Sequence, residues 1–131
     1  MKIIAKNSNL IFKQQVPPEW IDVVISDVAG KAISGILPNQ TVVVKAEILE
    51  NTGTVQTCRP YVGVGTETQI RYYERLFDEI SATPGTKMPE QSVVMAKLSD
   101  ENPMMRLGLY AGDEVPRPVG ITIKFSYYVK S

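Results

Sequence analysis

The stretch TVVVKAEILENTGTVQTCRPYVGVG, from Thr41 to Gly65, decides the fold of this chain. Apolar residues take every second position of its first run: Val42, Val44, Ala46 and Ile48. This period of two is typical of a strand that buries one face. Asn51 and Gly53 tolerate the positive φ of a tight reversal. We therefore expect the second run to fold back beside the first as a hairpin near the middle of a sheet.

The second run of the same stretch also alternates. Cys58, Val62 and Val64 fall on one face, whereas Arg59 and Tyr61 fall on the other. Since the first three are apolar, they are expected to point into the core, and Cys58 is interpreted as a small buried hydrophobe rather than a reactive thiol.

The remaining strand-like runs are short and separated by turn signals. They span residues 20–27, 32–37, 92–98, 105–110 and 120–130. The last has the most regular alternation, with Phe125 as its central apolar residue. Residues 81–91, which contain Pro84-Gly85, are predicted to form a loop. Many short strands without alternating helices predict an all-β fold, an antiparallel β-sandwich.

Residues 66–80 permit two interpretations. As a strand, Ile70, Tyr72 and Leu76 alternate with polar residues, although Glu74 interrupts the apolar side. As a helix, the apolar residues recur at helical spacing, and Thr66 with Gln69 has the spacing of a capping box. The sequence leaves open one short helix near 66–80.

The N-terminal residues are predicted to form an arm or edge strand, 1–16, followed by a single β-sandwich domain, 17–131. Pro17-Pro18 cannot continue regular structure and separates the two. Burying one large apolar side chain is worth roughly 1.5–3 kcal/mol, so the arm's apolar side chains are expected to be covered. They are assigned as assembly contacts, either with the chain's own sheet or with a neighbour: Ile3, Ile4, Leu10, Ile11 and Phe12.

Composition excludes several classes of function. The chain has 131 residues, with 14 basic residues balancing 14 acidic ones. A neutral chain lacks the field that gathers phosphates, so neither nucleic acid nor an anionic membrane is an expected partner. The chain has no histidine and one cysteine, which removes the commonest general base and a thiolate zinc site. We predict no enzyme activity, no catalytic residues, no metal site and no cofactor.

Acidic pairs and glycine motifs do not change this view. Asp78–Glu79, Asp100–Glu101 and Asp113–Glu114 lie in or beside predicted turns and are interpreted as solvated. Calcium binding is a weaker alternative, because the alternating Asp spacing of a calcium loop is missing. Gly63-Val64-Gly65 lacks the third glycine and the Lys-Ser/Thr tail of a phosphate loop.

Aromatic residues are the candidates for ligand binding. Exposed rings on a sheet can stack on the apolar C–H face of a sugar, and the residues assigned to such glycan binding are Trp20, Tyr61, Tyr72 and Tyr73. The competing interpretation is that these rings pack in the core, since aromatic residues favour strands in any case.

Three segments resemble the jelly-roll modules known as carbohydrate-binding domains. They are ILPNQTVVVKAEILENTGT, MRLGLYAGDE and the closing strand GITIKFSYYVKS. The resemblance implies a jelly-roll-like sandwich and, as one function, a carbohydrate-binding module that binds glycans through exposed aromatic residues.

The overall character of the chain is similar to the small jelly-roll virion proteins of tailed phages. Its apolar N-terminal run is too short for a signal peptide, so synthesis in the host cytoplasm is expected. The resemblance implies a place in the virion. This resemblance implies a non-enzymatic structural protein, a capsid auxiliary, decoration or head-fibre protein. Its implied partners are the major capsid protein or a fibre, and a second copy of the chain.

Overall fold

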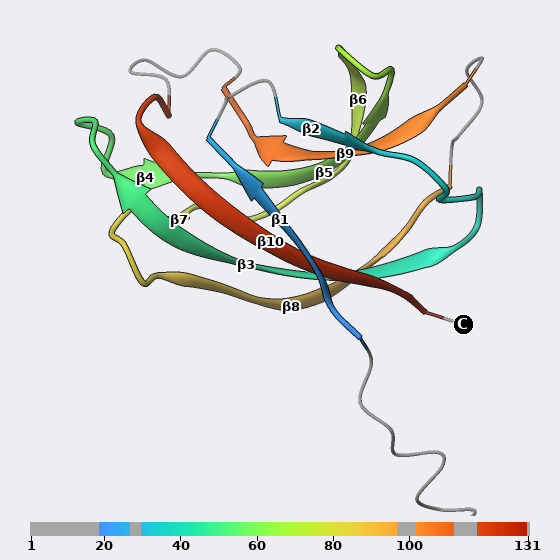
Figure 1. Ribbon diagram of the computed structural model, residues 1–131, viewed down its shortest axis with the longest axis horizontal. Coiled ribbons are helices and arrows are strands. Elements are labelled where there is room, and N and C mark those ends of the chain that lie inside the picture. Colours follow the sequence, from blue (N-terminus) through green and yellow to red (C-terminus); the bar gives the residue numbers. More distant parts are fainter. Residues whose placement is uncertain (1–18, 27–29, 97–101, 112–117, 131) are drawn as a thin grey trace, which may run out of the picture.

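The protein is an antiparallel β-sandwich. The computed structural model describes residues 19–26, 30–96, 102–111 and 118–130. Sheet A contains, in order, β1 (Ile21–Ile25), β10 (Ile121–Lys130), β3 (Thr41–Asn51) and β8 (Lys87–Val94). Sheet B contains β2 (Lys31–Ile33), β9 (Met104–Leu109), β5 (Pro60–Gly65) and β6 (Ile70–Leu76). A short ribbon pairs β4 (Thr57–Cys58) with β7 (Ile80–Ser81). Figure 1 shows sheets A and B as two layers.

The path of the chain through these layers is that of a jelly roll. The chain crosses from one sheet to the other between β1 and β2, β2 and β3, and β3 and β5. After the β5–β6 hairpin it crosses again at β8, β9 and β10. Eight main strands in two antiparallel sheets joined in this way make the double-sheet jelly roll. The sequence predicted the antiparallel β-sandwich, and the resemblance implied the jelly-roll form.

The core lies between the two sheets. The alternation predicted for the first run is confirmed, because Val42, Val44, Ala46 and Ile48 are all buried members of the core. From the facing sheet, β5 and β9 contribute a second apolar layer: Val62, Val64, Met105, Leu107 and Leu109. Phe125 is fully buried, with 0% of its surface exposed, and Cys58 is buried as expected.

The predicted hairpin over Thr41 to Gly65 is wrong. β3 pairs with β10 and β8, whereas β5 pairs with β6 and β9 in the other sheet. The turn itself does form, since the Gly53 amide donates to Asn51 Oδ1 at 3.0 Å. Asn51 Nδ2 also donates to the carbonyls of Val55 at 2.8 Å and Ala82 at 3.3 Å, so this side chain directs the chain out of sheet A.

The helical alternative for residues 66–80 is also wrong, because this segment forms β6 and β7. The residues with capping-box spacing close a β-turn instead. Thr66 N donates to the Gln69 carbonyl at 2.8 Å, and Gln69 N donates to Thr66 Oγ1 at 3.1 Å. Register shifts beside Glu74 and Arg71 place extra residues in β6. These bulges explain why its apolar residues do not alternate regularly.

The loop predicted over 81–91 is too long, since β8 begins at Lys87. Two residues of β8, Pro89 and Glu90, lie opposite the single residue Lys45 of β3, which forms a bulge. Pro89 is tolerated because β8 is the outer strand of sheet A, where a missing amide donor costs little.

Several predicted features lie outside the described residues. They are the arm 1–16 with its apolar side chains, and the acidic pairs Asp100–Glu101 and Asp113–Glu114. Within the described ranges, Asp78 and Glu79 are both exposed, and Glu79 Oε1 accepts a hydrogen bond from Thr57 Oγ1. No helix in the same ranges is long and apolar enough to cross a membrane.

We expect Phe125→Ala to lower the free energy of unfolding by roughly 3–5 kcal/mol, because truncation leaves a cavity between the sheets. The neighbouring Lys124→Ala faces outward and should change stability by less than about 0.5 kcal/mol. Urea unfolding of both variants checks the prediction. Equal losses at the two positions would contradict the assignment of inner and outer faces.

Candidate functional site

The four aromatic residues predicted to bind glycans do not form one site. Trp20 lines a hollow on the outer face of sheet A. Tyr61 and Tyr73 contact each other on the outer face of sheet B, with ring centroids 4.9 Å apart. Tyr72 is half-buried and packs against the core between the sheets. The structure therefore offers two separate candidate faces.

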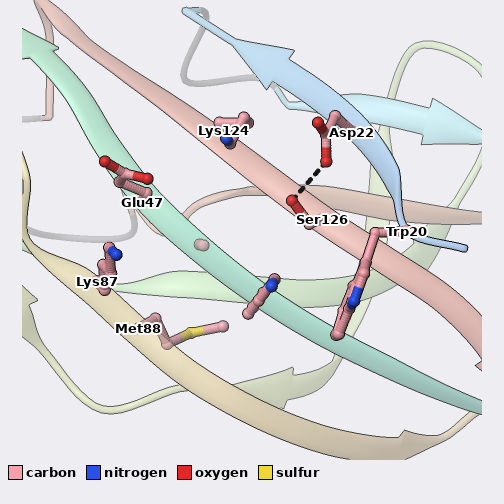
Figure 2. Close-up of a pocket in the computed structure, with 9 residues that line it drawn as sticks. Trp20, Asp22, Glu47, Lys87, Met88, Lys124 and Ser126 are labelled. Atoms are coloured by element: carbon pink, nitrogen blue, oxygen red, sulfur yellow. Dashed lines mark hydrogen bonds between the residues drawn. The ribbon is translucent and has the colours of Figure 1, made fainter. Parts of the chain in front are cut away.

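The hollow on sheet A has a volume of about 290 Å³ and is lined by residues of β1, β10, β3 and β8. Trp20 stands at one end of it, as Figure 2 shows. Six polar or charged residues line the hollow: Asp22, Lys45, Glu47, Lys87, Lys124 and Ser126. We call these six residues and Trp20 the sheet A hollow.

Two neighbours fix the Trp20 ring. Tyr128 packs against it edge to face, with centroids 4.8 Å apart and an interplanar angle of 85°. Lys45 Nζ lies 4.2 Å from the centre of the same ring. A cation–π contact of this kind contributes about 0.5–1 kcal/mol at an exposed position. The contact holds an ammonium group beside an aromatic surface inside the sheet A hollow.

A short hydrogen bond joins the two strands at the edge of the hollow. Ser126 Oγ donates to Asp22 Oδ1 at 2.6 Å, as Figure 2 shows. The two residues are direct partners in the β1–β10 ladder, and Ser126 is buried. A hydroxyl that donates to a carboxylate makes a charge-assisted bond, which is stronger than a neutral one. This bond engages part of the Asp22 carboxylate and fixes its orientation.

The other charged side chains of the hollow form a row across three strands. Glu47 of β3 is the ladder partner of Lys124 in β10 and of Lys87 in β8. The Ser126–Asp22 bond is the one hydrogen bond drawn among the lining residues in Figure 2. Within the described ranges, Lys87, Lys124 and Glu47 have no hydrogen-bond or ion-pair partner for their charged groups, which are therefore available to a ligand.

The outer face of sheet B carries a cluster of three tyrosines. Tyr73 contacts Tyr61 and, on its other side, Tyr110, whose ring centroid is 5.2 Å away. Tyr73 is 39% exposed, whereas Tyr61 is only 2% exposed. Tyr61 was predicted to bind glycans, but its ring is covered. Of the tyrosines assigned to glycan binding, only Tyr73 offers an exposed ring.

Glycines explain how Tyr61 becomes buried on an outer face. A Cβ at Gly108 would lie 2.6 Å from Tyr61 Oη, and one at Gly30 would lie 2.7 Å from the same atom. The bare backbone at these positions leaves the room that the phenol ring fills. Burial raises the pKa of Tyr61 above its ordinary value, although the nearby Arg106 acts in the opposite direction. The phenol therefore stays protonated at neutral pH.

Arg106 completes this face and was missed from the sequence. Its side chain is 2% exposed, and Nη1 donates to the carbonyls of Thr66 at 2.7 Å and Glu67 at 3.0 Å. It lies across the ladder from Gly63, and a Cβ at Gly65 would come within 3.0 Å of Arg106 Cδ. Gly63 and Gly65 were the sequence signal for this arrangement, because glycines leave space for a side chain that lies flat against the sheet. Arg106 holds the β5–β6 turn.

The two faces thus differ in chemistry. The face of sheet B is filled by the chain's own tyrosines and arginine, whereas the sheet A hollow combines an aromatic ring, ammonium groups, carboxylates and a hydroxyl. Within the described ranges, no three His, Cys, Asp or Glu side chains gather where they could hold a metal ion. The hollow is suited to binding a polar ligand that also has an apolar surface.

Comparison of the chain with family models, with curated proteins and with solved structures gives no match.

We expect Gly108→Ala to destabilise the protein by about 1–3 kcal/mol, the usual cost of overpacking a well-filled site. Gly108 lies outside the positive-φ region, so the cost is the steric clash with Tyr61. In a Tyr61→Ala background the same change should cost much less, because the clashing ring is gone. Urea unfolding of the double-mutant cycle measures the coupling, and additive losses would contradict the proposed packing.

Proposed function

We propose that this chain is a non-enzymatic structural protein of a virus particle, a capsid auxiliary or decoration protein of a tailed phage. The observation that carries the proposal is the strand order of sheets A and B, a jelly roll built from eight main strands. Viral capsid proteins and lectins both use this architecture. Because one fold supports many functions, the proposal also needs a surface suited to assembly.

The β1 edge of sheet A is such a surface. Among the described strands, β1 pairs on one side with β10 and has no partner on the other. Ile21 and Val24 are 52% and 55% exposed on this short strand. An open edge with exposed apolar residues can accept an additional strand from another chain, as in β-augmentation.

The opposite edge of the same sheet is protected. β8 carries the bulge at Pro89 and Glu90, and Lys87 stands at its start. Proline, a bulge and charged residues are the usual devices that prevent edge-to-edge pairing. The contrast between β8 and β1 favours β1 as the edge that takes part in assembly.

The sequence before β1 fits this proposal. Pro17-Pro18 precede the strand, and the arm 1–16 carries Ile3, Ile4, Leu10, Ile11 and Phe12. We assign these apolar residues to contacts with neighbouring subunits of the particle. The proposed partners are the major capsid protein, a fibre protein or a second copy of this chain.

Mass spectrometry of purified particles from the phage that encodes this chain tests the proposal. We expect the chain to be present in many copies per particle. Val24→Lys should lower its incorporation about tenfold, which corresponds to a loss of about 1.4 kcal/mol of binding free energy. The added ammonium group would have to be desolvated at the pairing edge.

Val119→Lys is the matched control, because Val119 is also exposed, at 63%, and lies beside Gly53 rather than on β1. It should leave incorporation unchanged. Absence of the chain from purified particles would overturn the proposal, and normal incorporation of Val24→Lys would exclude the β1 edge as the contact.

A second candidate function is that of a carbohydrate-binding module, which is compatible with display on a particle. The observation that favours it is the sheet A hollow, where the half-buried Trp20 ring stands beside several hydrogen-bonding side chains. Sites with an apolar wall and a few convergent polar groups are typical of small-ligand binding. Glycans are the partners that this candidate implies.

A further inference from the structure

We infer that the sheet A hollow binds an acidic glycan, through a sugar unit that carries a carboxylate. This inference rests on the second candidate function, carbohydrate binding, and specifies its ligand class. Three features of the hollow carry it: a fixed aromatic ring, an excess of ammonium groups and a small residue, Ser126, in its lining.

The aromatic ring and an ammonium group are already joined. Lys45 Nζ lies over the Trp20 ring, 4.2 Å from its centre, and Tyr128 packs against that ring in a T-shaped contact. A ligand anion that meets Lys45 is thereby placed next to the indole. A sugar acid presents both matching groups in one unit, since its carboxylate lies on the same ring as its apolar C–H surface.

The charges of the hollow favour an anion. Lys45, Lys87 and Lys124 supply three ammonium groups against the two carboxylates of Asp22 and Glu47. The Asp22 carboxylate already accepts a hydrogen bond from Ser126. The lining therefore has a net positive charge. Glu47 lies between Lys124 and Lys87, so one carboxylate faces two ammonium groups.

The floor of the hollow gives the ligand room to approach. Ser126 is small and contributes to the lining of the hollow on the outer face of β10. The bulge of β8 lies opposite Lys45, at the same level of the sheet. Bulges bend a strand and redirect its side chains, and they are frequent beside binding sites.

Other anions fit less well. The chain as a whole is neutral, so it lacks the extended positive field that collects nucleic-acid phosphates. An acidic peptide supplies carboxylates but lacks a rigid apolar C–H face to place against Trp20. The acidic sugar uses both the ammonium groups and the aromatic ring.

Calorimetric titration of the full chain with oligogalacturonate tests this inference. We expect binding that weakens as salt rises, because ammonium–carboxylate contacts are screened. Lys45→Gln and Trp20→Ala should each weaken binding about tenfold. Lys31→Gln on β2 is the matched control and should bind like the parent chain.

Each further outcome has a definite meaning. Equal affinity for the carboxyl-reduced, neutral oligosaccharide would overturn the acidic-glycan inference while carbohydrate binding stands. Tighter binding of polyglutamate than of oligogalacturonate would overturn it in favour of an acidic peptide. Binding of neither saccharide would remove the second candidate function as well, whereas the particle measurement tests the virion proposal independently. Thermal unfolding checks that Trp20→Ala is folded. If it is not folded, the affinity of Lys45→Gln alone tests the inference.

Discussion

The register between β3 and β10 is the constraint on which the rest of the structure depends. This ladder runs through the centre of sheet A and joins the middle of the chain to its C-terminal strand. A slip of one residue would exchange the two faces of a strand. It would bring Phe125 out of the core and turn Lys124 and Ser126 inward. The same register that forms the core therefore also forms the sheet A hollow.

The two outer faces show different uses of the same architecture. On sheet B, Tyr61 and Arg106 lie along a backbone of glycines and cover it, so that this face is closed by the chain's own side chains. On sheet A, Trp20 is held by Tyr128 and Lys45 at the side of an open hollow. The arrangement on sheet B stabilises the fold. The arrangement on sheet A leaves polar groups that still have capacity for hydrogen bonds or ion pairs with a ligand. This difference is why we place ligand binding on sheet A.

Local patterns were enough to predict the fold class and the inner faces, but not the pairing of strands. Burial of Phe125 follows from period-two alternation, which a strand expresses residue by residue. Asn51 indicates that the chain reverses. The sequence does not indicate which sheet the next strand joins, because this depends on partners distant in the chain, such as the Ala82 carbonyl that accepts from Asn51. The bulges of β6 hide its strand pattern and allow a helical interpretation. Trp20 was identified from the sequence as a candidate for ligand binding. Lys45, Asp22 and Lys124 lie in the same hollow only because the register between strands places them there.

The unequal edges of sheet A also bear on the size of any assembly built from this chain. Continuous fibres need a subunit that both donates and accepts strands along one direction, as open heterologous interfaces do. Here β8 is blocked by Pro89 and its bulge, whereas β1 is open. Direct pairing of sheet A with sheet A through two β1 edges would therefore join two copies and then stop, because both outer edges of the combined sheet would be β8. The bulge of β8 thus limits the growth of such a continuous sheet.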